Sequence, residues 1–260
     1  MSSIQSIEDN GFVILRNRLS QDKVFKFLKV CNDEFKKSKS SKKDVPFLNQ
    51  NTPVVYNIQN KNLEIIEYLL DNKEIEDILI HFLNDKFYRQ IDQSQPNYIL
   101  RAIGSRSSNV ELPLHIDSFI PFIGNELIAM QVSIILEDQS IENGCTFIIP
   151  GSHKSGKYAD KTKELKRIPL TPKKGDIVIW DSRIWHGAYE NKTNLTRWAI
   201  IATFARWWVK QQFDIPNNLP SKFKNKLTDK QLSILGNCSI PPNDESESID
   251  MKKGYIHEKK

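Results

Sequence analysis

The spacing of apolar residues changes partway along this chain of 260 residues. Before about residue 90 the apolar positions recur at the three- and four-residue intervals of helices, whereas from about residue 96 they form short runs typical of strands. Helical patterns followed by strand patterns, without regular strand–helix alternation, argue against a doubly wound sheet. We therefore predict a mainly β, α+β protein: a double-stranded β-helix (a jelly-roll or cupin-like barrel) with N-terminal helices packed on one sheet.

Local signals place the individual elements. Residues 4–16 predict a short helix that leads into an apolar strand, and Ser20 is a favourable N-cap for a second helix. A loop rich in Lys and Ser over residues 36–44 should end that second helix. The tripeptide Asp71-Asn72-Lys73 should divide the helical stretch 62–84 into two helices. Six runs predict strands: 98–103, 129–136, 146–149, 167–170, 176–180 and 197–208.

The length favours a single domain over residues 1–260. Helical support is expected mainly within 1–90 and the barrel within about 96–210. A C-terminal helix and a peripheral tail are expected over 217–260, because the end of the chain is rich in Pro, Ser and charged residues.

Composition argues against several classes of protein. No apolar run is long enough to span a bilayer, and the N-terminus has neither a basic start nor an apolar stretch, so we expect no membrane association and no signal peptide. The three cysteines are far apart and odd in number, which indicates reduced thiols and a cytoplasmic protein.

The net charge of +5 is modest and its excess is local, in a Lys/Ser run at 36–43 and a basic segment at 154–167. Such runs are most often solvated loops, but they would also attract an anionic substrate to a nearby site. We expect no nucleic-acid partner, because no nucleic-acid-binding motif accompanies the lysines.

The candidate site residues begin with His115 and Asp117, two apart, followed downstream by His186. Residues i and i+2 of a strand point to the same side, so His115 and Asp117 can share a metal ion. Two imidazoles and one carboxylate bind one face of Fe(II) and leave the opposite face open for a cosubstrate and O₂. Zinc accepts the same ligands, so a Zn-dependent hydrolase is an alternative.

The surrounding sequence resembles the phytanoyl-CoA dioxygenase-like family of Fe(II)/2-oxoglutarate oxygenases over roughly residues 8–240. The most specific part is Asn143-Gly144 followed by Pro150-Gly151-Ser152-His153. The matching segments are 112–117, 142–154, 174–180, 186–188 and Arg197. The resemblance implies an iron- and 2-oxoglutarate-dependent dioxygenase that uses O₂.

The resemblance also assigns roles to residues. His115, Asp117 and His186 would bind Fe(II), and Arg197, eleven residues after His186, would bind the far carboxylate of 2-oxoglutarate through its planar, permanently charged fork. Ala188 departs from the family, which often has a serine there to assist that carboxylate. Further cosubstrate contacts are expected among Thr193, Tyr98 and Arg101.

The implied reaction is hydroxylation of an unactivated C–H bond in a small metabolite, with release of succinate and CO₂, and an anionic metabolite is favoured by the basic segment. Ser118, Phe119 and Phe122 should line the substrate side, whereas His153 should be structural. A catalytically silent barrel that binds a ligand or a protein is a second alternative. The sequence does not distinguish a monomer from a homodimer, nor hydroxylation from desaturation.

Overall fold

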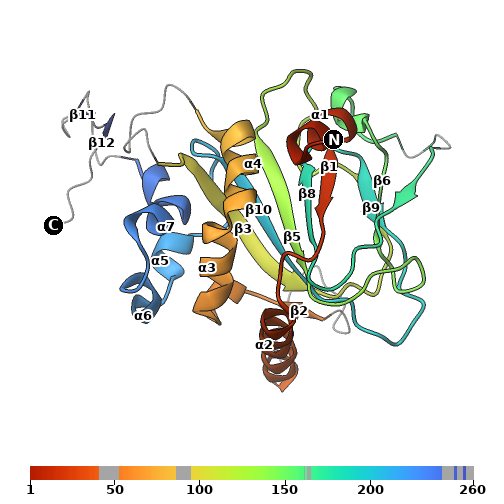
Figure 1. Cartoon of the computed structure of the whole chain (residues 1–260), viewed down its shortest axis with the longest axis horizontal. Helices are drawn as coiled ribbons and strands as arrows, with labels where there is room; N and C mark the ends of the chain where they lie inside the picture. The colour runs from red at the N-terminus through yellow and green to blue at the C-terminus, as the bar shows by residue number, and fades with distance from the viewer. Residues whose placement is uncertain are drawn as a thin grey trace.

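The computed structural model describes residues 1–40, 53–85, 95–160, 162, 165–241, 249–250 and 254–255. Two antiparallel sheets form its centre, and Figure 1 shows helices on one side of the larger sheet and the smaller sheet on the other. The larger sheet has six strands in the order β1 (Phe12–Leu15), β8 (Ile177–Asp181), β5 (Ala129–Ile135), β10 (Ala199–Arg206), β3 (Tyr98–Arg106) and β2 (Val54–Val55). The smaller sheet has four, in the order β4 (Leu112–His115), β9 (His186–Ala188), β6 (Thr146–Ile148) and β7 (Ile168–Pro169).

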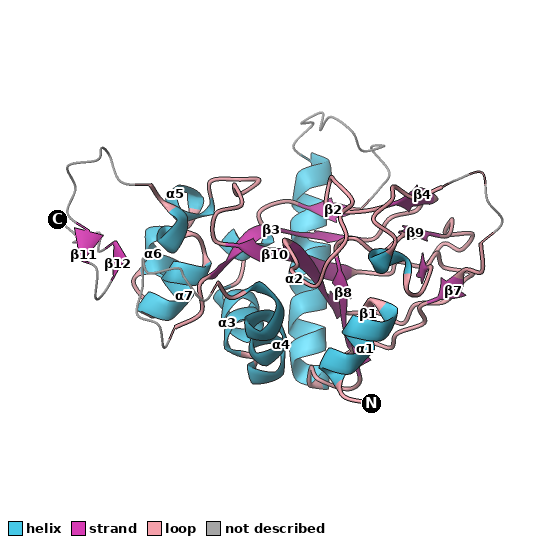
Figure 2. Cartoon of the chain, turned by 90° about the horizontal axis from the view of Figure 1, so that it is seen from above, coloured by secondary structure: helices cyan, strands magenta, loops and turns pink. Residues whose placement is uncertain are grey.

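Helices cover one face of the larger sheet because each buries an apolar stripe against it. These are α1 (Ser3–Asn10), α2 (Gln21–Ser40), α3 (Leu63–Asp71) and α4 (Lys73–Leu83). Phe27 of α2, Leu69 of α3 and Leu79 of α4 share one core with Leu100 and Phe204 of the sheet. The view from above shows α3 and α4 together on this face (Figure 2). The predicted packing of N-terminal helices on one sheet is thus confirmed.

Two details differ from the sequence analysis. Helix α2 continues to Ser40, so Lys36 and Lys37 belong to a helix and not to a loop. Ion pairs one turn apart, such as Lys37 with Glu34, support this extension. In place of one C-terminal helix, the described residues form three short α-helices, α5 (Ile215–Asn218), α6 (Ser221–Lys224) and α7 (Asp229–Ile234).

The expected division at Asp71-Asn72-Lys73 is confirmed. Asn72 ends α3 and caps α4, where its side chain accepts a hydrogen bond from the backbone N–H of Ile75. Asn is a favourable N-cap residue, so a single position both stops one helix and starts the next.

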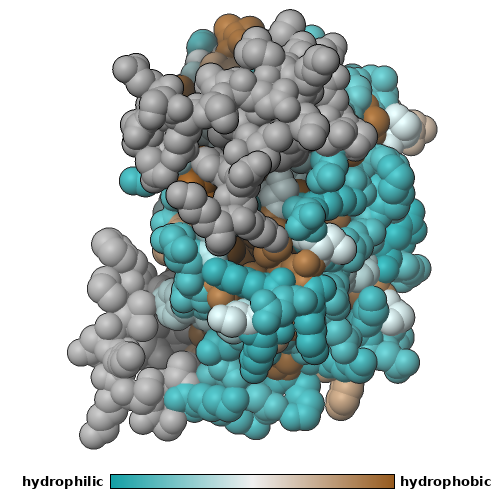
Figure 3. Space-filling model, turned by 90° about the vertical axis from the view of Figure 1, so that its left-hand side faces the viewer, coloured by the Kyte–Doolittle hydropathy of each residue, from teal (hydrophilic) through white to brown (hydrophobic). Residues whose placement is uncertain are grey.

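The end of the molecule formed by the C-terminal helices presents mostly hydrophilic side chains, with isolated hydrophobic ones between them (Figure 3). Beyond it lies a small strand pair, β11 (Ile249–Asp250) and β12 (Gly254–Tyr255). Much of the predicted tail, and residues 41–44 of the Lys/Ser run, lie outside the described residues. Among the described helices, none has the length and apolar character that crossing a membrane requires.

The second face of the larger sheet packs toward the smaller sheet. Ile135, Val178 and Ala199 from the larger sheet share a second core with Ile148 of β6. The space between the two sheets is therefore where β4 and β9 present their inward side chains.

Candidate metal centre and active site

Three of the predicted site residues meet where β4 and β9 pair. His115, the last residue of β4, stands opposite His186, the first residue of β9, and their ring centroids lie 4.2 Å apart. Asp117 places one carboxylate oxygen 3.5 Å from His115 Nε2 and the other 3.4 Å from His186 Nε2. One ligand atom from each residue lies within 4.8 Å of the other two, so the group could hold a metal ion.

Asp117 is positioned by the turn before β9 and not by β4. Both His115 and Asp117 were expected on one strand, but β4 ends at His115. The backbone N–H groups of Asp117 and Ser118 donate instead to the carbonyl of Ser182, at 2.8 and 3.0 Å. Because the same turn leads into β9 and His186, it fixes two of the three side chains.

A buried ion pair holds this turn. Arg183 binds the carboxylate of Asp181 through Nη2 at 2.7 Å and Nε at 3.1 Å, and both side chains are almost fully buried. Arg183 Nη1 also donates to the carbonyl of Gly124 at 2.7 Å, and the guanidinium lies 4.5 Å from the ring centre of Phe122. Arg183 therefore ties the turn to the loop that follows Asp117. Sequence analysis missed it, because a charged residue in a turn reads as solvent-exposed.

Both histidines direct Nε2 toward the carboxylate, because Nδ1 is engaged elsewhere. His115 Nδ1 lies 2.8 Å from the carbonyl oxygen of Pro113, and His186 Nδ1 lies 3.0 Å from that of Ile184. A carbonyl only accepts, so in the neutral ring Nδ1 carries the hydrogen and Nε2 keeps its lone pair. A neutral imidazole oriented in this way is ready to bind a metal ion.

The charges of the three groups also suit a metal ion. Burial would raise the pKa of Asp117, but the nearby His186 and His115 outweigh it and lower that pKa to about 2. Burial lowers the pKa of His186. Burial opposes charge on His115 as well, yet its hydrogen bonds to Asp117 and Pro113 raise its pKa. At neutral pH the site therefore offers an ionised carboxylate and a neutral His186.

Arg197 is buried and has no carboxylate partner among the described residues. It is 7% exposed, and its Nε donates to the carbonyl of Ser108 at 3.1 Å. Burial lowers the pKa of Arg197 to about 10. No acidic oxygen of the described residues comes within 4.0 Å of its guanidinium. A buried guanidinium without a counter-ion is a site for a bound anion.

Arg101 and Phe119 stand beside Asp117. The guanidinium carbon of Arg101 lies 4.9 Å from the ring centre of Phe119, and the charges of Arg101 and Asp117 attract each other. Phe119 has a φ of 65° and is 70% exposed. A left-handed backbone at a bulky residue costs roughly 1–3 kcal/mol and is found mainly at functional sites. Phe119 therefore combines a strained backbone with an exposed ring, two residues after Asp117.

The larger sheet contributes polar groups to the space between the sheets. On neighbouring strands, Thr203 donates a hydrogen bond to Gln131 at 2.8 Å, and Trp180 stands opposite Gln131 in the sheet register. The ring centroid of Trp180 lies 5.7 Å from that of His186. Its buried Nε1–H has no hydrogen-bond partner among the described residues, so this donor can serve a bound molecule.

Other predicted residues lie apart from this group. Tyr98 packs edge to face on Phe204 in the core between the larger sheet and the helices. The hydroxyl of Thr193 donates to Asn191 at 2.7 Å within the loop after β9. His153 is buried, with Nε2 3.1 Å from the carbonyl of Glu8, as a structural histidine would be.

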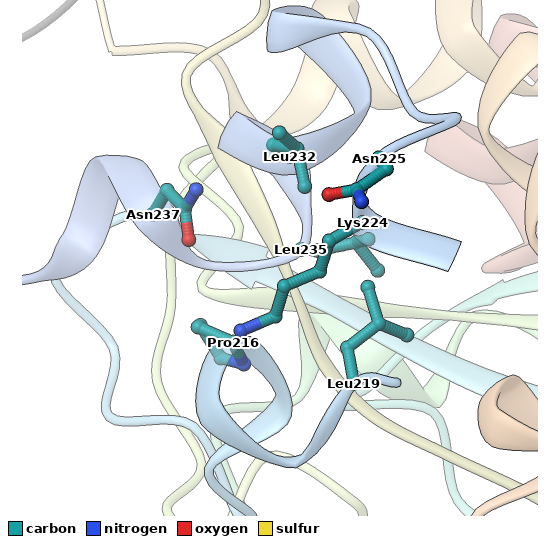
Figure 4. A pocket seen from close by; sticks show the side chains of 7 residues that line it. All are labelled: Pro216, Leu219, Lys224, Asn225, Leu232, Leu235 and Asn237. Atoms are coloured by element: carbon teal, nitrogen blue, oxygen red, sulfur yellow. The ribbon is translucent and has the colours of Figure 1, made fainter. Parts of the chain in front are cut away.

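A separate cavity lies between the C-terminal helices, and Figure 4 shows the side chains that line it. Leu219, Leu232 and Leu235 provide much of its wall, with Lys224 and two asparagines at its edge. Its lining has no histidine, cysteine or carboxylate, so it offers no group for metal binding or acid–base chemistry.

A family model described as Phytanoyl-CoA dioxygenase (PhyH) matches residues 7–199 of the chain. "Dioxygenase himG" of Aspergillus japonicus is 22% identical over 80% of this chain and 69% of its own length. An uncharacterized protein of Mycobacterium tuberculosis is 29% identical over 33% of this chain, and the match spans only about a third of that relative, 32%.

A solved structure resembles most of this architecture. The crystal structure of HygX from Streptomyces hygroscopicus, with nickel and 2-oxoglutarate bound, aligns with a TM-score of 0.60 and 13% identity. The alignment covers 80% of this chain and 88% of that one. The two proteins therefore share a fold.

Proposed function

The chain belongs to the phytanoyl-CoA dioxygenase family, and on that premise we propose that it is an Fe(II)- and 2-oxoglutarate-dependent dioxygenase. Its two facing antiparallel sheets accord with the double-stranded β-helix expected for such an enzyme. The observation that carries the proposal is the His115, Asp117 and His186 group, and the buried Arg197, which has no carboxylate partner among the described residues, supports it.

We propose that His115, Asp117 and His186 hold Fe(II). The donor set fits: two imidazole nitrogens with available lone pairs and one ionised carboxylate are the ligands of the iron in this class of oxygenase. When bound, the iron would supply oxidation of a C–H bond by O₂, coupled to conversion of 2-oxoglutarate to succinate and CO₂. The chain's own contribution is to hold the three ligands through the Pro113, Ile184 and Ser182 carbonyls.

Arg197 would bind the far carboxylate of 2-oxoglutarate. A guanidinium pairs with a carboxylate bidentately, and water exclusion at a buried site strengthens that pair. The charge balance supports this role, because the described residues offer Arg197 no carboxylate of their own. HygX, which shares the fold, is a protein crystallised with 2-oxoglutarate.

The substrate is proposed to be a small anionic metabolite. Arg101 is partly buried beside Asp117 and, within the described chain, forms no ion pair at 4.0 Å or less. Arg101 extends from β3 to the Phe119 ring, so it places a positive charge beside the loop where we expect a substrate to approach. The sequence analysis attributed the preference for an anion to the basic segment 154–167. We now attribute it to Arg101, beside the metal-binding group.

Succinate production tests the proposed activity. Purified protein supplied with Fe(II), 2-oxoglutarate and O₂ should form succinate, faster when a suitable small anion is added. Asp117→Ala should abolish it, because the remaining two histidines bind Fe(II) too weakly. Full succinate production by Asp117→Ala would contradict the assignment. Hydrolysis that needs zinc and proceeds without O₂ would favour the hydrolase alternative, in which Arg197 has no evident purpose.

A further inference from the structure

The buried Arg197 guanidinium has more hydrogen-bonding capacity than its surroundings use. Of its five N–H groups, the one on Nε reaches the Ser108 carbonyl, and no bond from the Nη atoms to a described residue is present. A carboxylate held by that fork keeps further lone pairs, and in a buried site each of these gains from a second donor. The question is which side chain supplies that donor.

The sheet register points to Thr146. Thr146 and Ile148 of β6 stand opposite Ala188 and His186 of β9, respectively. Directly opposed residues of an antiparallel pair project to the same face, so Thr146 and Ala188 share the face of His186. Two residues along a strand amount to ~7 Å, a span comparable with the length of a five-carbon dicarboxylate. A ligand with one end at His186 can thus reach Thr146 with the other.

Arg197 lies at the same end of β6. A Cβ atom added to Gly144 would come within 3.2 Å of Arg197 Nε, which places the guanidinium against the residues that lead into Thr146. Cys145, the residue between them, and Arg197 also influence each other electrostatically. The loop before β6 therefore carries the chain past Arg197 immediately before Thr146.

The Thr146 side chain is available. Although β6 is flanked by β9 and β7, Thr146 is only partly buried, whereas its neighbours Cys145 and Phe147 are fully buried. The backbone carbonyl of Thr146 accepts from Leu170, but its hydroxyl makes no hydrogen bond to any part of the chain that the structure describes. This hydroxyl is a free donor in the space between the sheets.

We propose that the Thr146 hydroxyl donates a hydrogen bond to the far carboxylate of 2-oxoglutarate, alongside Arg197. The inference rests on the proposed function. It also explains how the chain can bind this carboxylate although Ala188 stands where the family often has a serine. The Thr146 hydroxyl lies on the neighbouring strand β6, directly opposite Ala188 and on the same face.

The proposal is tested by measuring the dissociation constant of 2-oxoglutarate. The Fe(II)-loaded protein is titrated with 2-oxoglutarate without oxygen, and binding is monitored by the visible charge-transfer absorption. Thr146→Val keeps the shape and removes the donor, and should weaken 2-oxoglutarate binding roughly ten- to a hundredfold, as loss of a bond to a charged group does. Thr146→Ser should bind like the wild type. The matched control is Thr196→Val, next to Arg197, whose hydroxyl bonds Glu137, and it should change the constant less than twofold.

Two further arms separate a direct contact from a structural effect. Ala188→Ser in the Thr146→Val background should restore most of the lost affinity, because it returns a hydroxyl to the same face. Binding of 2-oxopentanoate, which has the same carbon chain without the far carboxylate, should be equally weak in wild type and Thr146→Val.

The outcomes distinguish this proposal from the proposed function. If wild type binds 2-oxoglutarate and Arg197→Ala does not, while Thr146→Val binds like wild type, the role of Thr146 is wrong and the function stands. If Thr146→Val weakens 2-oxopentanoate as much as 2-oxoglutarate, the contact with the far carboxylate is likewise wrong. Absence of 2-oxoglutarate binding to the iron-loaded wild type would overturn both.

Discussion

The two sides of the candidate site are built differently. On the metal-binding side, His115 and His186 are each held by a hydrogen bond from the ring to a backbone carbonyl, and Asp117 is held by one from its backbone N–H. A buried ion pair secures the turn between β8 and β9. On the opposite side, the loop after Asp117 exposes Phe119 with a strained backbone. The difference suggests that the first side carries the chemistry common to the family and the second carries the choice of substrate.

The largest effect is expected on the unfolding free energy, when the buried Arg183–Asp181 ion pair is broken. Arg183→Met would leave the Asp181 carboxylate buried without its counter-ion, which typically costs about 3–5 kcal/mol of unfolding free energy. Urea unfolding measures this loss. Because Arg183 also holds the loop after Asp117, affinity for Ni(II), a stand-in for Fe(II), should fall as well.

A control variant distinguishes the buried Arg183–Asp181 ion pair from an exposed ion pair. Lys73→Met removes an exposed partner of Asp77 and should have the small effect typical of surface pairs. Equal stability of Arg183→Met and Lys73→Met would show that the metal-binding side is not secured as described.

A smaller effect concerns pH. Metal binding must displace the proton of His115, whose pKa is raised, whereas Asp117, with a pKa of about 2, is already ionised and His186 is already neutral. As pH falls through the pKa of His115, protonated His115 accumulates and affinity for Ni(II) should drop, approaching about tenfold per pH unit below that pKa. Calorimetric titrations between pH 6 and pH 8 measure the trend.

The exposed histidine of α4 provides the comparison. His81→Gln should leave the pH dependence of Ni(II) affinity unchanged, since His81 contacts Glu8 at the surface and not the metal-binding group. Affinity that stays constant as the pH falls would contradict proton competition at His115.

The smallest effect on the fold is expected at the substrate side. Phe119→Ala removes an exposed ring and should change the unfolding free energy by no more than about 0.5 kcal/mol. The dissociation constant of 2-oxoglutarate should stay the same, whereas KM for the organic substrate should rise. A parallel loss of 2-oxoglutarate affinity would show that the two sides are not separate.

The sequence predicted the metal-binding side well, because its residues lie in short motifs. Two histidines and an aspartate at the observed spacings predict the group that β4 and β9 bring together, and the helix break at Asn72 follows from local capping. What local motifs do not encode is which strands become neighbours. Thr146 was not identified, because its relation to Ala188 depends on the register of β6 and β9, and the partner of Arg183 became evident only in the folded turn.

Tyr98 illustrates a different limit. A regular strand alternates faces, but β3 carries one extra residue at Arg101, where its register with β10 shifts between Thr203 and Phe204. The bulge puts Tyr98 and Leu100 on the helix-facing side together with Ile103, although an odd number of positions separates Ile103 from each of them, and Arg101 reaches the Asp117 side. A bulge of this kind re-aims side chains without a clear signature in the sequence.

Anaerobic titration of the Fe(II)-loaded wild type and Arg197→Ala with 2-oxoglutarate tests the central claim most directly. The wild type should develop a weak visible charge-transfer band that saturates with 2-oxoglutarate, and Arg197→Ala should show none at the same concentrations while still binding iron. Iron-loaded wild type that develops no band would contradict the assignment of this site to 2-oxoglutarate-dependent oxygenase chemistry.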